Sequence, residues 1–121
     1  MSHPSMRRNF VATMNEQISG EFKNDMFNGK GTVYYADGRK IIGDWVNDKM
    51  NGKGVSYFAD GRIYDGEWSD GKQAGYGILT WPDGQRYEGQ FKDDKMDGEG
   101  KMYYPNGYVI KGIWSNDTFM K

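Results

Sequence analysis

The sequence predicts an all-β protein, a single-layer, elongated and twisted antiparallel meander of tandem 23-residue β-hairpin repeats. Three observations support this fold class. Glycines recur every 23 residues, at positions 20, 43, 66, 89 and 112. Apolar and polar residues alternate around each of these glycines, which is typical of half-buried strands. Other glycines lie so close together between Gly20 and Gly112 that no long amphipathic helix can form.

Length and composition fit a single repetitive domain. The chain has 121 residues, of which 36% are hydrophobic and 16% aromatic. So many rings are unusual in a disordered chain. The formal net charge of −1 favours neither nucleic acid nor anionic lipid as a partner. The sequence contains no cysteine, so it needs no oxidising compartment, and we expect a cytoplasmic protein.

The first strand of each unit is centred on a recurring glycine. In the third unit Tyr64 and Trp68 flank Gly66 on one face, while Asp65 and Glu67 point to the other. We expect the bare glycine to leave a slot in which a ring from a neighbouring strand lies. A glycine within a strand costs about 0.5–1 kcal/mol, so the arrangement is favourable only if a ring fills the slot. The equivalent pairs are Ile18 and Phe22, Ile41 and Trp45, Tyr87 and Phe91, and Ile110 and Trp114.

The second strand of each unit follows a Gly-x-Gly step and ends in a ring. These strands are Val33 to Tyr35, Ser56 to Phe58, Leu79 to Trp81 and Met102 to Tyr104. Asp-Gly or Asn-Gly follows each of them, and such dipeptides adopt the left-handed backbone angles of tight hairpin turns. The result is a meander of about ten strands, with Phe10 to Thr13 as a degenerate first strand.

The repeat divides the chain into a tail and an array. We expect residues 1–9 to form a flexible tail and residues 10–121 to form the array. The units are 17–39, 40–62, 63–85 and 86–108, followed by a half unit, 109–121.

The segment YDGEWSDGKQAGYGILTWPDG, residues 64–84, resembles the MORN (membrane occupation and recognition nexus) repeat. The consensus of that family runs Tyr-x-Gly-x-Trp, then Gly-Lys-x-x-Gly-x-Gly, an apolar strand and Asp-Gly. Two kinds of departure occur, and we expect them to weaken ring stacking at the ends of the array without changing the register. Isoleucine replaces the tyrosine at positions 18, 41 and 110, and Asn24-Asp25, Asn47-Asp48 and Asp93-Asp94 replace the Asp-Gly that precedes the lysine position.

No motif predicts catalysis, a cofactor or a metal site. Gly66 to Gln73 has the spacing of a phosphate-binding loop, but Gln73 has no hydroxyl to hold magnesium and a strand follows instead of a helix. Asp93 to Gly98 imitates a calcium loop, but Lys95 stands where a carboxylate is needed. His3 is the only histidine, so no catalytic triad can form. We therefore expect a protein that is not an enzyme.

The ring-lined face is the predicted partner-binding surface. A single-layer sheet leaves one side of its aromatic row open, and exposed apolar surface usually marks a partner site. The predicted contact residues are Trp45, Tyr64, Trp68, Trp81, Tyr87, Phe91, Tyr104 and Trp114. Val109 to Ser115 and the first strand present open edges for strand addition or self-association.

Two functions follow from these features. The first is a non-catalytic scaffold that binds a protein segment, and small proteins made of these repeats resemble adaptors of cilia and other cytoskeletal assemblies. The alternative, which the family name suggests, is a peripheral membrane module. The net charge disfavours it, because each cation near an anionic surface contributes only about 1 kcal/mol.

Overall fold

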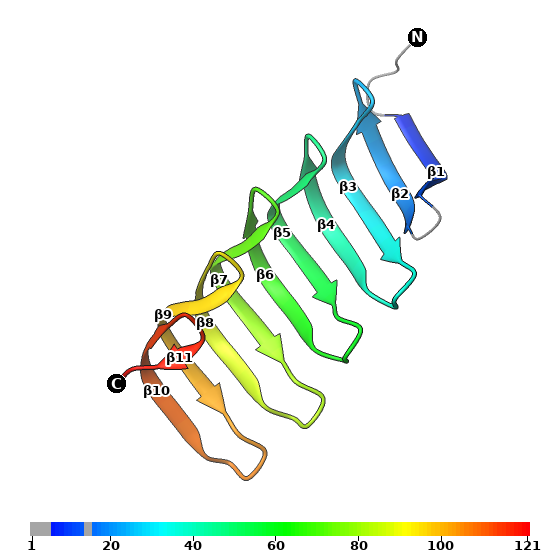
Figure 1. Cartoon of the computed structure of the whole chain (residues 1–121). Coiled ribbons are helices and arrows are strands. Elements are labelled where there is room, and N and C mark those ends of the chain that lie inside the picture. The colour runs from blue at the N-terminus through cyan, green and yellow to red at the C-terminus, as the bar shows by residue number, and fades with distance from the viewer. Residues whose placement is uncertain (1–5, 14–15) are drawn as a thin grey trace.

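Eleven antiparallel strands follow one another in sequence order and form one sheet (Figure 1). The computed structural model describes residues 6–13 and 16–121, with side chains from residue 18 onward. The described chain is a single-layer, elongated meander with its termini at opposite ends, which confirms the predicted fold class. The strands are β1 (Met6–Thr13), β2 (Glu16–Lys23), β3 (Met26–Tyr35), β4 (Lys40–Val46), β5 (Lys49–Tyr57), β6 (Ile63–Ser69), β7 (Lys72–Thr80), β8 (Arg86–Lys92), β9 (Lys95–Tyr103), β10 (Val109–Ser115) and β11 (Thr118–Phe119).

The first strand is longer than the sequence predicts. β1 begins at Met6 instead of Phe10, because residues 6–9 pair with residues 19–22 of β2. The prediction of a flexible tail is therefore wrong for residues 6–9, which belong to the sheet. The other tail residues, 1–5, lie outside the described residues. At the carboxyl end β11 pairs with Trp114 and Ser115 of β10 and adds an eleventh strand.

Two kinds of turn alternate along the meander. At one edge both central residues have positive φ, the pattern of a type I′ turn, as at Asn47 (48°) and Asp48 (72°). At the other edge only the glycine has positive φ, as at Gly61 (97°). There the amide of Gly61 donates to the carbonyl of Phe58 (3.0 Å) and the amide of Phe58 donates to the carbonyl of Arg62 (2.9 Å). The prediction that both residues of Asp60-Gly61 adopt left-handed angles is therefore wrong for the aspartate, because a three-residue loop needs only one such angle.

A β-bulge bends the hairpin at the same place in each of the four full units. In the third unit Gly66 pairs with Gly77, but Trp68 pairs with Gln73, so β7 has extra residues between these two pairs. Gly75 lies among them with a φ of 74°, which a glycine adopts without strain. Equivalent register shifts occur in the β2–β3, β4–β5 and β8–β9 pairs. Because bulges bend strands, the sheet bends along a line that crosses every unit.

Four of the type I′ turns, from the turn at Asn47-Asp48 onward, are also bonded to the preceding unit, an arrangement we call the turn clamp. The amide of Asp94 donates to the carbonyl of Gln73 (3.1 Å), and the amide of Gln73 donates to Oδ1 of Asp94 (2.8 Å). Asp48 bonds Phe27 in the same way, and Asp117 bonds Met96. Gly71 makes only the backbone half of the clamp, to Met50 (2.8 Å). Aspartate at the second turn position, a departure from the family pattern, thus adds a hydrogen bond between units.

The glycine slots are filled. The prediction that a ring from a neighbouring strand fills the slot is correct for Gly20, which Phe27 of β3 covers, and wrong for Gly66. In the third unit Tyr64 lies over Gly66 of its own strand and over Gly77 of β7. A Cβ atom added to Gly66 would lie 2.5 Å from Cα of Gly77 and 2.8 Å from the Tyr64 hydroxyl oxygen. That hydroxyl donates to the carbonyl of Glu67 (2.7 Å). Tyr87 fills the slot of the fourth unit in the same way.

Where isoleucine replaces the tyrosine, the residue nine positions later fills the slot. Phe27 covers Gly20 and Gly31, and Met50 covers Gly54. Phe27 also stacks on Phe22, with a centroid distance of 5.2 Å, and on Trp45, at 4.7 Å. The expectation that isoleucine weakens ring stacking at the ends is therefore wrong for the first unit, because Phe27 supplies the ring from β3.

Candidate binding groove

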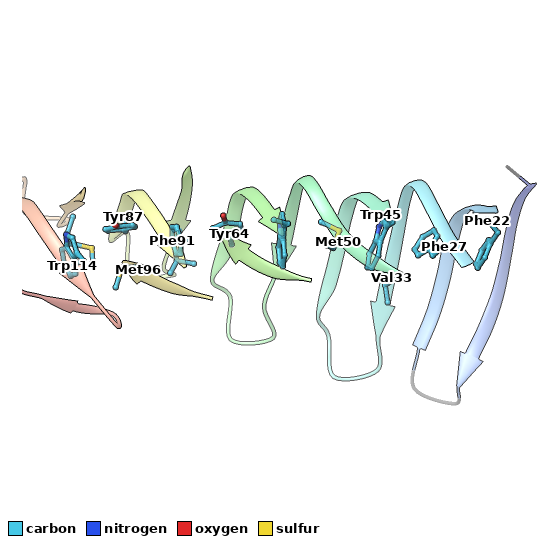
Figure 2. Packing of buried hydrophobic residues seen from close by; sticks show 13 residues of the cluster. Phe22, Phe27, Val33, Trp45, Met50, Tyr64, Tyr87, Phe91, Met96 and Trp114 are labelled. Atoms are coloured by element: carbon cyan, nitrogen blue, oxygen red, sulfur yellow. The ribbon is translucent and has the colours of Figure 1, made fainter. Parts of the chain in front are cut away.

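Six of the eight predicted contact residues are buried in the core. Figure 2 shows their row, with labels on Trp45, Tyr64, Tyr87, Phe91 and Trp114, in one file along the sheet. Their exposed fractions are Trp45 7%, Tyr64 0%, Trp68 7%, Tyr87 0%, Phe91 4% and Trp114 5%. The expectation of an open aromatic row is wrong for these six rings, because Tyr64 and Tyr87 lie in glycine slots and all six pack into one core cluster.

The buried rings contact one another across units. Tyr64 meets Trp68 at a centroid distance of 5.3 Å and Phe91 of the next unit at 4.9 Å, both edge to face. Tyr87 repeats this with Phe91 and with Trp114, at 5.3 and 5.4 Å. Burial raises the pKa of both tyrosine hydroxyls, and that of Tyr87 reaches about 12. These rings hold the array together.

The other two predicted residues, Trp81 and Tyr104, lie half-buried beside the core. They belong to a row of rings that we call the rungs, one per unit, at the end of each second strand. The rungs are Tyr35, Phe58, Trp81 and Tyr104. The predicted contact residues did not include Tyr35 and Phe58, although both recur at the 23-residue period immediately before a turn. That position was the sequence signal that could have identified them.

A groove of about 550 Å³ runs between the rungs and the type I′ turns. Phe58 and Trp81 form one wall with Arg39 and Arg62, and edges of Trp68 and Phe91 reach its surface. Asp94 and Asp117, from the turns, lie on the other side. The volume is within the roughly 300–1,000 Å³ that is usual for ligand pockets.

The two arginines of the groove are held in place by their own turns. Arg62 lies 4.5 Å from the ring centre of Phe58 and pairs with Asp60 at 2.9 Å. Arg39 does the same with Tyr35, at 4.1 Å, and with Asp37. A backbone hydrogen bond from Arg62 and its side chain hold the pKa of Asp60 below its usual value. Each guanidinium group therefore lies over its rung with its charge paired to the aspartate of the same turn.

Two polar side chains lie almost wholly buried in the groove. Ser56 is 3% exposed and Gln73 is 6% exposed. Neither the hydroxyl of Ser56 nor the side-chain amide of Gln73 has a hydrogen-bond partner among residues 18–121. Among the described residues, the fully buried side-chain polar atoms without a partner are Nε1 of Trp68 and Nε1 of Trp114. The polar atoms of Ser56 and Gln73 are not in that set, so they reach the surface of the groove, where they can donate to a bound molecule. The sequence alone did not indicate either residue as a site residue.

The opposite face carries a hollow of about 690 Å³ near the carboxyl end. Tyr76, Gln90 and Ile113 line it together with three glycines, two glutamates and two lysines. It contains no recurring ring and no buried polar group. It therefore offers less specific binding than the groove.

The open edge predicted at Val109 to Ser115 is partly covered. β11 pairs with Trp114 and Ser115, and Ile113 exchanges backbone hydrogen bonds with Met120 and Lys121. Self-association through the sheet edges stays a prediction.

The described residues 6–13 and 16–121 contain no helix long and apolar enough to cross a membrane. Within the same ranges no three histidine, cysteine or acidic side chains are placed to share a metal ion. What the groove offers is apolar ring surface with a few hydrogen-bond groups.

A family model, the MORN repeat, matches four tandem segments of the chain. They are residues 19–38, 42–61, 64–86 and 87–107, in the register set by the recurring glycines. No curated protein shows significant similarity to the chain. MORN repeats are non-enzymatic modules that generally mediate interactions with proteins or membranes. Because the four matched segments cover most of the sequence, the chain belongs to the MORN repeat family.

Proposed function

We propose that the chain is a non-catalytic scaffold that binds a protein segment along the groove. The observation that carries this proposal is the row of rungs, one half-buried ring per unit, of which Phe58 and Trp81 line the groove. Aromatic rings supply large contact area at a small cost in conformational entropy, so they are favoured anchors at protein interfaces. Trp81 and Tyr104, with Phe58 and Tyr35, would contact the segment, and the buried rings would support them.

A displayed library of random peptides can test this function without knowledge of the natural partner. Peptides are selected on the wild-type protein and then measured against Phe58→Ala and Trp81→Ala. Loss of either rung should weaken binding by about tenfold or more, the usual effect of removing an aromatic anchor. Tyr57→Ala is the matched control, because Tyr57 is adjacent to Phe58 in the chain but is exposed on the opposite face.

The outcome also separates the groove from the other surfaces. If Tyr57→Ala weakens the selected peptides more than Trp81→Ala does, the binding site is on the opposite face and the proposal is wrong. If no peptide is selected but the protein sediments with anionic vesicles at physiological salt, the membrane alternative is favoured instead.

We further propose that this scaffold acts in the cytoplasm, within a cytoskeletal or ciliary assembly. The support is the resemblance to small proteins made almost wholly of MORN repeats. Fluorescence imaging of the tagged protein, before and after detergent extraction, tests this placement. A protein that is extracted completely, with no retained filamentous or ciliary signal, would contradict it.

A further inference from the structure

The rungs repeat at a fixed distance that selects the conformation of the bound segment. Each unit contributes one rung and two strands. Since neighbouring strands lie about 4.8 Å apart, successive rungs are separated by about 9.6 Å along the sheet. A segment that contacts several rungs must present one apolar residue on the same side at this interval.

Only one common backbone conformation meets this condition over several units. A polyproline II helix has about three residues per turn and a rise of about 3.1 Å, so every third residue returns to the same side after about 9.3 Å. A β-strand returns side chains to one face every second residue, at about 6.7 or 13.4 Å. An α-helix returns a side chain to the same side after two turns, at about 10.8 Å. This interval exceeds the distance between rungs by about 1.2 Å, so the mismatch grows with each unit.

The buried polar side chains of the groove support the same conformation. A polyproline II segment makes no internal hydrogen bonds, so all its carbonyl oxygens need donors. Ser56, two residues before the rung Phe58, and Gln73, beside the turn residue Asp94, both line the groove. Their side chains are more than nine-tenths buried and have no hydrogen-bond partner among residues 18–121, so they can donate to the segment. A helical segment would satisfy its own carbonyls and leave these two side chains unpaired.

Charge gives the bound segment a preferred direction. The arginines of the groove are paired within their own turns, at 2.9 Å. Asp94 and Asp117 accept only backbone hydrogen bonds and make no ion pair among the described residues. The groove therefore keeps negative charge beside its carboxyl-terminal units, where a basic residue of the segment is favoured.

We propose that the groove binds a proline-rich segment in the polyproline II conformation, with an apolar residue at every third position and a basic residue facing Asp94 and Asp117. This inference rests on the proposed function and names the class of its partner. Such segments bind aromatic-lined grooves with little loss of conformational entropy, because the free segment already adopts the bound conformation.

Synthetic peptides of one composition but different period test the inference. The probe contains four Pro-Pro-Leu triplets followed by two lysines, and its scrambled control clusters the leucines. Fluorescence anisotropy should show that the probe binds the full chain about tenfold more tightly than the scrambled peptide. Trp81→Ala should remove this difference, while Tyr57→Ala should leave it intact.

Charge and hydrogen bonding have separate readouts. Replacing the two lysines of the probe with glutamates should weaken binding about tenfold. Gln73→Leu should weaken the probe but leave the melting temperature within a few degrees of the wild-type value. Equal affinity for the lysine probe and the glutamate probe would overturn the predicted direction of the segment in the groove.

The experiments distinguish failure of the polyproline II inference from failure of the proposed scaffold function. A helical or alternating peptide that binds in a Trp81-dependent way, while the probe does not, overturns the polyproline II conformation and leaves the scaffold function standing. If neither the probe nor any library peptide binds in a Trp81-dependent way, both proposals are overturned.

Discussion

At the scale of single residues, the array depends on what covers its paired glycines. Gly66 and Gly77 lie opposite each other, and the aromatic ring of Tyr64 rests on both. Any side chain at Gly66 would have to displace backbone atoms of β7, which cannot move away without breaking the pairing. A polar neighbour such as Asp65 points to the other face and is exposed.

Substitution at the slot should therefore be costly, and substitution beside it should not. We expect Gly66→Val to reduce the free energy of unfolding by about 3 kcal/mol through overpacking. Asp65→Ala should change it by less than about 0.5 kcal/mol, as is usual at exposed positions. Denaturant titration of both variants measures the difference, and equal losses would show that the assignment of faces is wrong.

The slot can be filled from either of two positions, and this can be tested by exchange. Tyr64→Ile should cost about 2–4 kcal/mol, because it leaves a cavity over Gly66 and Gly77. Adding Gln73→Met reproduces the pair Ile41 and Met50 of the second unit and should restore about half of the loss. Thermal unfolding of the single and double variants gives the coupling, and strictly additive effects would contradict the shared slot.

The buried tyrosine hydroxyls make stability sensitive to alkaline pH. Burial raises the pKa of Tyr87 from 10.0 to about 12, so the unfolded chain releases this proton at lower pH than the folded chain. The stabilisation is complete below pH 10 and is lost as the pH rises through about 12, with a slope of up to about 1.4 kcal/mol per pH unit. Unfolding of wild type and Tyr87→Phe between pH 9 and 12 tests this, and the variant should show the shallower slope.

At the scale of elements, the hairpins are joined by backbone pairing and by the turn clamp. The clamp helps a one-layer sheet to bury its rings, because each clamped turn is fixed to the preceding unit and holds the bent end of its hairpin in place. Gly71 lacks the carboxylate, so the bond between the second and third units is the weakest of the series. Its φ of 82° is close to the 72° of Asp48 and the 69° of Asp94.

Completing the clamp should stabilise the protein. We expect Gly71→Asp to raise the free energy of unfolding by about 1 kcal/mol, because the new carboxylate can accept from the amide of Met50. Gly71→Ala should instead lower it by about 1 kcal/mol, since it adopts the left-handed conformation without gaining the bond. Melting temperatures of the two variants would differ in sign relative to wild type, and a common sign would contradict the clamp.

The strands and their order in the sheet could be predicted from the sequence. The glycine period and the alternation around Gly66 are local signals, and they were sufficient for the strands and the meander. The bond between Gln73 and Asp94 could not be predicted, because it joins residues 21 positions apart in different units. The bulge at Gly75 could not be predicted either, because the alternation around Gly66 does not show which residues of β7 are left without a partner. For that reason the burial of Trp68 and Tyr87 was missed, and Ser56 and Gln73 were not recognised as parts of the groove.

At the scale of the whole molecule, each unit contacts only its neighbours (Figure 1). Such arrays behave as chains of coupled units instead of a single cooperative core. The row of buried side chains is continuous, but the series of ring–ring contacts is interrupted at Met50, which lies between Trp45 and Trp68. This is also the place where the turn clamp is incomplete.

Local damage should therefore remain local. We expect Gly43→Val to accelerate amide hydrogen exchange in β4, β5 and the strands next to them, because a side chain there meets the backbone of β5. Strands β8 to β10 should keep their protection. Exchange measured by mass spectrometry distinguishes this from a uniform acceleration, which would mean that the array unfolds as one unit.

The identical relation between successive units also makes the length of the protein adjustable. Duplicating one 23-residue segment would insert two strands and one rung without altering any existing contact except at the point of insertion. The molecule would then act as a ruler with graduations of about 9.6 Å. Evolution could match it to a longer or shorter target simply by changing the number of copies in the gene.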